Sequence, residues 1–370
     1  MSVRVCHFTS AHKSNDIRIF HKECSSLAKA GYEVYLVAQG ESREENGVHV
    51  VGCGNPKGRI ERMFSFSKTI YKKAVSLDCD IYHFHDPELL VYAKKLKKMG
   101  KTVIFDSHED VPRQILAKTY IPVVLRKFVS KGFEKYELYV CKQIDGIVTV
   151  IEHIKNVFTQ ADIKNVAVVK NFPSRDDVIA ANKSEKENAV CYVGGISRER
   201  GISDIVKAMN SVDSKLYIAG SVSDVYKEQL IELNTSGNIE FTGFLSKSDV
   251  EELYSKCKVG LCVLHPTPNH INSLAIKIFE YMSCGIPVVC SNFPVWKGII
   301  EKYDCGICVE PQSIEEISDS INFLLNNPKR AKEMGENGRI AVVRELNWET
   351  QVETLITFYR LIQEKTNEIA

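Results

Sequence analysis

The sequence lacks several features that define specialised classes of protein. It has no run of about eighteen consecutive apolar residues, which a membrane-spanning helix requires. Its first residues, MSVRVCHFTS, lack the apolar core of a signal peptide and predict a strand instead. From these absences we expect a protein that is soluble or peripheral to a membrane.

Paired cysteines are also missing. The 12 cysteines lie mostly within apolar runs, and only Cys305 and Cys308 have CxxC spacing. A closed zinc site would need a second such pair, so we interpret these two thiols as part of a strand. Buried, unpaired thiols are typical of a reducing compartment, which indicates a cytoplasmic location.

Three common cofactor motifs are absent, namely GxGxxG, the Walker phosphate loop and HExxH. Polar clusters do follow two predicted strands: HFHDPEL contains His83, His85 and Asp86, and FDSHED contains Asp106 and His108. Their spacing on separate strand ends does not match a closed zinc site. The sequence therefore predicts no bound metal and no cofactor.

The sequence carries little net charge, but its two halves differ. Up to Phe172 there are 27 Lys+Arg and 19 Asp+Glu, and after it 21 and 28. The basic first half suits an anionic surface, and the acidic second half argues against nucleic-acid binding by the whole chain. Chance asymmetry between two domains would give the same numbers.

Short strand-like and helix-like segments alternate along the chain, which predicts parallel sheets covered by helices on both faces. The alternation stops at the polar stretch PSRDDVIAANKSEKEN and then restarts. We therefore predict an α/β protein with a first domain at 1–172, a linker at 173–188, a second domain at 189–346 and a terminal helical segment at 347–370. Ligands of such sheets bind beyond the carboxyl ends of the strands, so we expect a ligand in a cleft between facing domains.

One apolar stretch, NSLAIKIFEYMSCGIPVV from Asn272, predicts a buried helix, a turn and a strand. Ser273, Lys277 and Glu280 would lie on one face of that helix, and Asn272 or Ser273 would cap it. The capped end would leave first-turn N–H groups and Lys277 available to a phosphate. A surface ion pair between Lys277 and Glu280 is the alternative.

A second candidate anion site follows the strand AVCYV, in the sequence GGISRERG. Gly194 and Gly195 allow close approach of the backbone to a ligand, and Arg200 directly precedes a predicted helix. A solvated arginine on a turn is the alternative. Together with Lys277 and Glu280, which can accept hydrogen bonds from sugar hydroxyls, Arg200 indicates a nucleoside-diphosphate site.

In the first domain, His108 follows a strand end and is interpreted as a polar group that faces the cleft and a reacting hydroxyl. A core or capping histidine is the alternative. Asp16 and Arg18, in the first strand-to-helix turn, are expected on the same rim, as are His85 and Glu109.

The segment 120–139, YIPVVLRKFVSKGFEKYELY, mixes apolar residues with Arg126, Lys127, Lys131 and Lys135. Such a helix can lie on an anionic membrane, here the inner face of the cell membrane. A helix that packs on its own domain with a solvated basic face has the same composition, so both interpretations stay open.

The chain as a whole resembles glycosyltransferase family 4, whose members have two Rossmann-like domains in the GT-B architecture. The similarity runs in order through the segments NDIRIFHKECSSLAKAGYEV, DIYHFHDPELL, VIFDSHEDVPRQI, YVGGISRERG and SLAIKIFEYMSCGIPVV. It implies a metal-independent, retaining transfer of a hexose or N-acetylhexosamine from a nucleoside-diphosphate sugar, with UDP favoured. The acceptor would be a glycan or a lipid-linked glycan in surface-polysaccharide biosynthesis.

The resemblance also implies residue roles. Arg200 and Lys277 would hold the donor diphosphate, Glu280 the ribose, and His108 would face the acceptor and the transferred sugar. These four are the predicted catalytic residues. The remaining predicted donor contacts are Gly194, Gly195, Gly220, Gly243, Asn272, Ser273 and Leu274. The terminal helix would cross back to the first domain.

The chain departs from the family pattern at Asn272, where the first glutamate of the usual pair is expected, and at Gly195, where an arginine is usual. The subgroup pattern SLPNKLFEYM is closer to this chain and shares Lys277 and Glu280. Two other functions stay open: a nucleotide-sugar 2-epimerase of the same fold, and a non-catalytic subunit that binds a partner glycosyltransferase.

Overall fold

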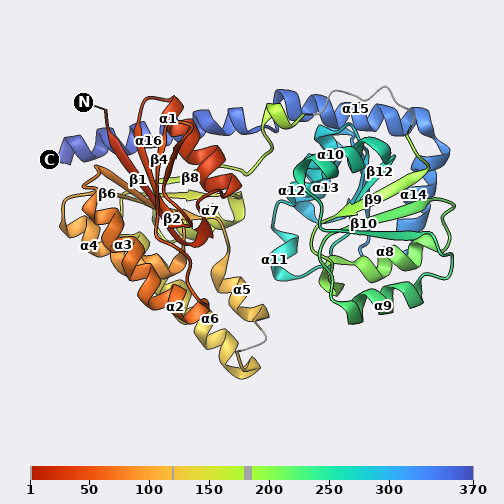
Figure 1. Ribbon diagram of the computed structural model, residues 1–370, viewed down its shortest axis with the longest axis horizontal. Helices are drawn as coiled ribbons and strands as arrows, with labels where there is room; N and C mark the ends of the chain where they lie inside the picture. Colours follow the sequence, from red (N-terminus) through yellow and green to blue (C-terminus); the bar gives the residue numbers. More distant parts are fainter. Residues whose placement is uncertain (1, 119–120, 179–185, 370) are drawn as a thin grey trace. The chain divides into compact units, whose positions relative to one another are not determined.

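The computed structural model describes residues 2–118, 121–178 and 186–369, in two compact units (Figure 1). Unit 1 comprises Met1–Asn171 and Thr350–Ala370, and unit 2 comprises Phe172–Glu349. Each is built on one mainly parallel sheet, so the predicted α/β class with two Rossmann-like sheets is confirmed. Of the predicted linker, 179–185 lie outside the described residues, and the predicted boundaries stay a prediction.

The sheet of unit 1 has 8 strands in the order β3-β4-β2-β1-β5-β6-β7-β8. All neighbours are parallel except β3 and β4, which form an antiparallel edge that the sequence did not predict. The strands are β1 (Arg4–Lys13), β2 (Glu33–Gln39), β3 (Arg43–Glu45), β4 (Val48–Gly52), β5 (Ile81–Phe84), β6 (Thr102–Ser107), β7 (Gly146–Thr149) and β8 (Val166–Val168).

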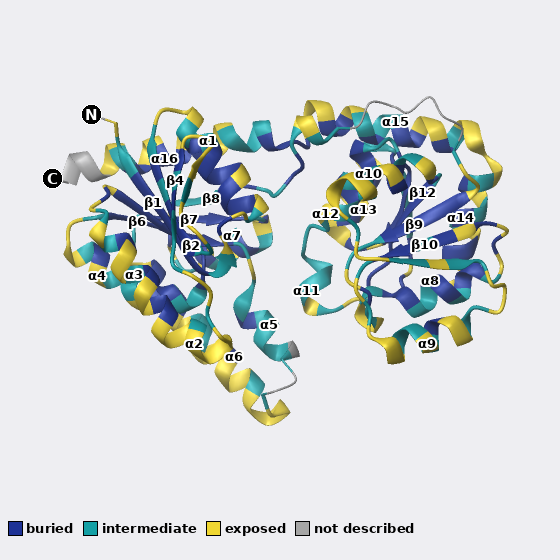
Figure 2. Cartoon of the chain, in the orientation of Figure 1, coloured by how far each residue is buried: buried dark blue, intermediate teal, exposed yellow. Residues whose placement is uncertain are grey.

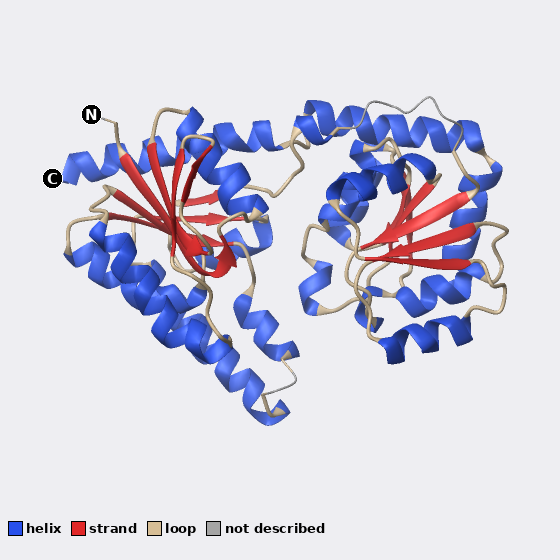
Figure 3. Ribbon diagram, viewed as in Figure 1, coloured by secondary structure: helices blue, strands red, loops and turns tan. Residues whose placement is uncertain are grey.

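Helices connect these strands (Figure 3). They are η1 (Ile17–Cys24), α1 (Ser25–Lys29), α2 (Arg59–Glu61), η2 (Arg62–Phe66), α3 (Ser67–Ser76), η3 (Pro87–Leu89), α4 (Leu90–Lys98), α5 (Val111–Ala117), α6 (Val123–Cys141) and α7 (Glu152–Gln160). The terminal helix α16 (Trp348–Ile369) contacts the sheet, as predicted. A side chain at Gly146 would collide with Phe358 of α16, so this glycine allows α16 to approach β7 closely.

The sheet of unit 2 has 6 strands in the order β11-β10-β9-β12-β13-β14. They are β9 (Ala189–Val193), β10 (Lys215–Ala219), β11 (Ile239–Gly243), β12 (Val259–Cys262), β13 (Val288–Ser291) and β14 (Gly306–Val309). Its helices are η4 (Arg175–Asp177), η5 (Arg198–Arg200), α8 (Ile202–Met209), α9 (Asp224–Leu233), α10 (Lys247–Lys256), α11 (Pro268–Ile271), α12 (Ile276–Ser283), α13 (Pro294–Tyr303), α14 (Ile314–Asn326) and α15 (Pro328–Arg344).

The central strands are buried on both faces, which explains their continuous apolar sequences (Figure 2). Two apolar clusters form the core of unit 2. One contains Tyr281 and Trp296 from α12 and α13. The other contains Ile202 and Leu324 from α8 and α14. Apolar side chains cover both faces of the sheet. The polar residues described below therefore lie at the ends of its strands.

The first half of α6 exposes its apolar residues. Val123, Val124 and Phe128 have exposed fractions of 73%, 79% and 77%, whereas the buried residues of this helix are Ser130, Glu137, Val140 and Cys141. The first half of α6 therefore leaves much of its apolar surface exposed, although Val129 lines a cavity of unit 1. Among the described residues, no helix combines the length and the apolar composition needed to cross a membrane.

Candidate functional site

At the carboxyl edge of the unit 2 sheet, glycines join the ends of three neighbouring strands. The Gly194 N–H after β9 donates to Ala219 O of β10, and the Gly220 N–H donates to Gly243 O of β11, each at 2.8 Å. A side chain at Gly220 would overlap the carbonyl of Gly194. These contacts hold the backbone compactly, so a ligand can approach it at this edge.

Lys277 of α12 reaches this glycine edge. A Cβ at Gly194 would overlap its ammonium and Cε, so Lys277 occupies the space that a side chain at Gly194 would take. Its Nζ lies 6.0 Å from the ring centroid of Tyr192. Burial lowers the pKa of Lys277, although the Glu280 carboxylate opposes this effect. A partly buried cation at a strand end is a suitable partner for a bound anion.

Arg200 approaches the same loop from the other side. A Cβ at Gly195 would lie 3.5 Å from Arg200 Nε, and Tyr192 Oη donates to Gly195 O at 2.7 Å. Burial raises the pKa of Cys262 to about 12, and the charges of both Lys277 and Arg200 act against that rise. The two predicted cations therefore converge on one two-glycine loop.

The predicted helix in the stretch from Asn272 begins later than expected. Asn272 ends the short helix α11, and α12 begins at Ile276 with Ala275 as its N-cap and no side-chain cap. Ser273 Oγ donates to His270 O at 3.1 Å instead. The prediction that Asn272 or Ser273 caps α12 is therefore wrong, because Pro268 starts a separate helical turn. The first N–H groups of α12 consequently lack a side-chain cap.

Lys277 and Glu280 do not form the surface ion pair that was the alternative. Tyr254 Oη donates to Glu280 Oε2 at 3.0 Å, while Lys277 points to Gly194. Both side chains are half-buried. Glu280 keeps acceptor capacity beyond its one bond from tyrosine, as a ribose contact would need. Of the predicted stripe, Ser273 lies outside the helix.

Two further residues have structural contacts in unit 2, the predicted donor contact Leu274 and the histidine His265. Leu274 packs against the apolar cluster of Tyr281 and Trp296. His265 Nε2 lies 2.6 Å from Asp204 Oδ2, and the backbone N–H of His265 donates to Glu199 O. This histidine therefore braces the segment that carries Arg200.

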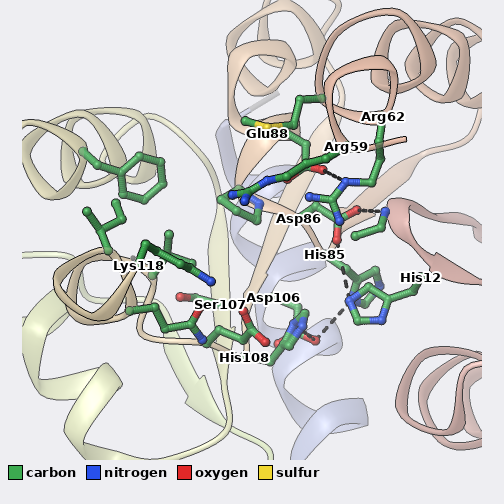
Figure 4. Close-up of a pocket in the computed structure, with 18 of the residues that line it drawn as sticks. His12, Arg59, Arg62, His85, Asp86, Glu88, Asp106, Ser107, His108 and Lys118 are labelled. Carbon is green, nitrogen blue, oxygen red and sulfur yellow. Dashed lines mark hydrogen bonds and ion pairs between the residues drawn. The ribbon is translucent and has the colours of Figure 1, made fainter. Parts of the chain in front are cut away.

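In unit 1, a cavity of about 750 Å³ opens at the carboxyl ends of β1, β5 and β6 (Figure 4). Its polar wall includes the predicted residues His85, His108 and Glu109. Its apolar wall is formed by Ile60, Met63, Phe105, Val111, Ile115, Ile121, Val129 and Phe133. The cavity therefore combines groups that can orient a hydroxyl with an apolar surface.

Asp106 organises the polar wall. Arg18 Nε donates to its Oδ2 at 3.0 Å, and His85 Nδ1 lies 3.1 Å from the same oxygen. His108 Nδ1 lies 3.6 Å from it. Although burial opposes ionisation, the Arg18 guanidinium and the histidine contacts hold the pKa of Asp106 well below its ordinary value. The carboxylate thus stays charged beside His108, whose Nδ1 is buried without a hydrogen bond.

The structure corrects two predicted acceptor-side residues. Arg18 is buried and also donates to Val169 O at 3.0 Å, so it supports Asp106 from inside the unit and does not line the cavity. Asp16 caps η1 by accepting from the N–H groups of Arg18 and Ile19, so it too lies outside the lining. Asp16 therefore serves the local fold of the first turn, whereas Arg18 joins elements inside unit 1.

His12 is a lining residue that the sequence interpretation missed. Its Nδ1 lies 3.1 Å from Asp16 Oδ2, and its ring is 5.2 Å from that of His108. Burial disfavours its charge, but the hydrogen bond to Asp16 and the charge of Asp86 raise the pKa of His12. The rule that placed Asp16 at the rim, the carboxyl end of the first strand, applies equally to His12 and could have found it.

Three cations of the lining were also missed: Arg59, Arg62 and Lys118. In Figure 4, Arg59, Arg62 and Glu88 lie together, away from Ser107 and His108. Arg62 Nε lies 3.2 Å from Glu88 Oε1. Arg59 and Arg62 begin α2 and η2, whereas Lys118 follows α5, and no local motif marks Lys118 as their neighbour.

Comparisons with known proteins identify the family of the chain. A family model described as "Glycosyltransferase Family 4" matches residues 18–173, and one described as "Glycosyl transferases group 1" matches residues 174–341. The chain is 24% identical to an uncharacterized glycosyltransferase of Methanocaldococcus jannaschii, over 57% of this chain and 58% of that protein.

Two further similarities cover nearly the whole chain. The capsular polysaccharide biosynthesis glycosyltransferase CapM of Staphylococcus aureus is 20% identical over 96% of each chain. The crystal structure of HepE from Anabaena in complex with UDP superposes with a TM-score of 0.69 at 13% identity, covering 99% of this chain and 100% of that one. At this level of identity, the second similarity shows a shared fold.

Proposed function

The chain belongs to the group 1, family 4 glycosyltransferases of the GT-B fold, and from this membership we propose that it moves a hexose or N-acetylhexosamine from a nucleoside-diphosphate sugar to a glycan or lipid-linked acceptor. The family is retaining and metal-independent, so we expect the same of this transfer. In this proposal, unit 2 binds the donor and unit 1 binds the acceptor, with domains at the boundaries predicted from the sequence.

One observation carries the proposal: Lys277 and Arg200, 77 positions apart in the sequence, both border the loop of Gly194 and Gly195. The uncapped start of α12 adds backbone N–H groups, and Glu280 follows one turn beyond Lys277. Two cations with a helix N-terminus suit a diphosphate, and the carboxylate suits ribose hydroxyls. As the diphosphate leaves, these fixed charges stabilise its growing negative charge.

The proposed chemical step needs no protein nucleophile. The acceptor hydroxyl oxygen bonds to the anomeric carbon while the bond from that carbon to the diphosphate oxygen breaks on the same face. The hydroxyl proton passes to the departing diphosphate oxygen. His108, whose Nδ1 lies 3.6 Å from Asp106 Oδ2, contacts the acceptor hydroxyl or the transferred sugar in this proposal.

We favour UDP as the donor nucleotide and surface polysaccharide as the pathway. UDP is bound in the structure of HepE, and the similar CapM protein is named for capsular polysaccharide biosynthesis. These statements concern those proteins and support the proposal for this chain only as precedents. The sugar and the acceptor linkage depend on loops whose residue types do not identify them.

We further propose that unit 1 contacts an anionic membrane through α6, on the cytoplasmic face. Apolar Val124 and Phe128 are exposed beside the exposed Lys127 and Lys131. This combination suits the acyl boundary and the anionic headgroups of a lipid surface. A lipid-linked acceptor would then enter the cavity through its apolar wall, to which Val129 of α6 contributes.

The proposal is tested by measuring release of nucleoside diphosphate in the presence of acceptor. We expect Lys277→Ala and Glu280→Ala each to reduce it by about 10²–10³-fold, the usual cost of losing one electrostatic contact to the transition state. Normal turnover in both variants would contradict the proposal. A thermal-shift series with UDP, GDP and ADP comes first, because a non-catalytic subunit need respond to none of them. Formation of a new sugar without acceptor would instead indicate the 2-epimerase.

A further inference from the structure

Three histidines and a glutamate form a fully buried cluster inside unit 1, behind the cavity. The residues are His7 on β1, Glu23 on η1, and His83 and His85 on β5. One ligand-type atom from each, a ring nitrogen or a carboxylate oxygen, lies within 4.8 Å of all the others. Each of the four residues is at most 1% exposed.

The outward nitrogen of each histidine already has a partner. His85 Nδ1 lies 3.1 Å from Asp106 Oδ2. His83 Nδ1 lies 2.7 Å from Tyr359 Oη, and His7 Nε2 lies 3.1 Å from the same oxygen. A hydroxyl oxygen has two lone pairs and can accept from both rings. In metal centres, such outer bonds fix ring orientation and leave the inner nitrogens for the ion.

Of the four inner atoms, His7 Nδ1 and His85 Nε2 hydrogen-bond to each other, and the other two have no hydrogen bond. His7 Nδ1 and His85 Nε2 lie 2.9 Å apart, and His7 Nδ1 lies 4.0 Å from Glu23 Oε2. His83 Nε2 and Glu23 Oε2 are buried without a hydrogen bond. In a tetrahedral N/O site with bonds of about 2.0–2.2 Å, ligand atoms lie roughly 3.3 Å apart. Small side-chain movements would bring the four atoms to that spacing.

The surrounding charges allow a cation despite Arg18. Arg18 Nη2 lies 3.0 Å from Glu23 Oε1, and the same guanidinium pairs with Asp106. Two carboxyl groups, those of Glu23 and Asp106, therefore face one guanidinium. A divalent ion would bind beside Oε2, the carboxylate oxygen that Arg18 does not contact.

We propose that His7, Glu23, His83 and His85 bind one divalent transition-metal ion, zinc by preference, as a structural centre of unit 1. Three imidazoles and one carboxylate are the ligands that zinc takes in tetrahedral sites. Through Tyr359, the ion would tie α16 to β1 and β5. This departs from the sequence-based expectation of no metal and assigns the ion no role in the transfer step.

The first test uses the unmodified full-length chain, stripped with a chelator and titrated with zinc chloride. We expect uptake of one equivalent per chain and a rise of about 5–10 °C in the melting temperature at a hundredfold excess over the dissociation constant. Cobalt(II), bound in place of zinc, should give the visible absorption of a tetrahedral site. Failure of the stripped protein to take up one equivalent of either ion would overturn the proposal.

Variants locate the site. Glu23→Gln keeps the size of the side chain but removes its charge, and His83→Asn removes one inner nitrogen. We expect each to lose the stoichiometric zinc, with His49→Gln, at a half-buried histidine on β4 outside the cluster, as the matched control. Stoichiometric zinc in both cluster variants, or its loss in His49→Gln, would contradict the assignment. If a cluster variant does not fold, the proposal is decided by the cobalt spectrum of the unmodified chain.

Discussion

Gly194 shows at the scale of a single residue how a missing side chain positions a charge. Its φ of 140° disfavours other residues, and a Cβ there would overlap the ammonium of Lys277. We predict that Gly194→Ala moves this ammonium and weakens UDP binding about tenfold, equivalent to roughly 1.4 kcal/mol. Isothermal titration calorimetry with UDP measures the change.

Gly298→Ala is the control for this prediction. Gly298 lies in α13 of the same unit, and a Cβ there meets no atom within 4 Å. An alanine in a helix interior is favourable, so this variant should bind UDP as the parent does. If the parent, Gly194→Ala and Gly298→Ala bind UDP with equal affinity, Lys277 does not depend on Gly194 for its position.

Glu137 gives a prediction about pH. It is buried in α6, and burial together with the charge of Asp110 raises its pKa from 4.5 to about 8. Between these values the folded protein keeps a proton that the unfolded chain has lost, so stability falls as pH rises. Glu137→Gln should remove this fall and stabilise unit 1 by a few kcal/mol above pH 8, at about 1.4 kcal/mol per pKa unit. Denaturant unfolding at pH 5 and pH 9 measures the free energy of unfolding of the parent and of Glu137→Gln. If this free energy falls equally between the two pH values in both proteins, the prediction is contradicted.

Single site residues could be predicted where a polar or charged residue directly followed a predicted strand. His108 was named from that logic. Arg200 was named from its place before a predicted helix, and Lys277 and Glu280 from one face of a predicted helix; the roles of all four stay proposals. The buried set of His7, Glu23 and His83 was not predicted as a group, because its members stand within segments whose pattern indicates strand or helix. Only the strand order β1-β5-β6 brings them together, and pairing order cannot be read from periodicity.

At the scale of elements, α12 links stability to ligand binding. Its N-cap, Ala275, offers no side-chain hydrogen bond. Replacing it with Ser or Asp should each stabilise unit 2 by about 1 kcal/mol, because both cap the first N–H groups. If a phosphate binds there, Ala275→Asp should also repel it and weaken UDP binding, while Ala275→Ser weakens it less.

The comparison of these two variants isolates charge from capping. Thermal melting measures the stabilisation, and calorimetry with UDP measures the affinity. Tighter binding by Ala275→Asp than by Ala275→Ser would mean that no anion lies at this helix end.

The elements themselves were largely predictable because alternating βα units have strong periodicity. The sequence predicted the start of α12 too early for a physical reason. The run Leu274–Met282 has helical apolar spacing throughout, but its first two residues follow the turn after α11 and lie outside the helix. The edge strand β3 was missed because REE has no apolar pattern. Short edge strands depend on a neighbour more than on their own sequence.

The exposed apolar residues of α6 give a prediction at the same scale. Val124→Asp with Phe128→Asp should abolish co-sedimentation with vesicles that contain anionic lipid, because the change removes apolar area and adds negative charge. Val91→Asp, on α4 at 54% exposure, is the matched control and should sediment like the parent. Retained binding by the double variant would exclude α6 as the membrane contact.

At the scale of the whole molecule, the polar, aperiodic stretch after Pro173 was enough to predict two domains, since each half has its own run of alternating strands and helices. The last helix is different. Its sequence follows unit 2, yet it belongs to the core of unit 1. Unit 1 is therefore completed only when α16 has been made, and unit 2 can form its sheet from contiguous sequence.

This connectivity predicts that a change in α16 affects the two units unequally. Leu355 is fully buried on α16, whereas Leu361 on the same helix is 42% exposed. Leu355→Ala should lower the stability of unit 1 by about 2–5 kcal/mol through the cavity it leaves, while Leu361→Ala should change it by about 0.5 kcal/mol or less. Unit 2 should keep its own transition in calorimetry, identified by its upward shift with UDP. If Leu355→Ala lowers both transitions equally, or lowers the transition that UDP shifts, the two units do not unfold independently.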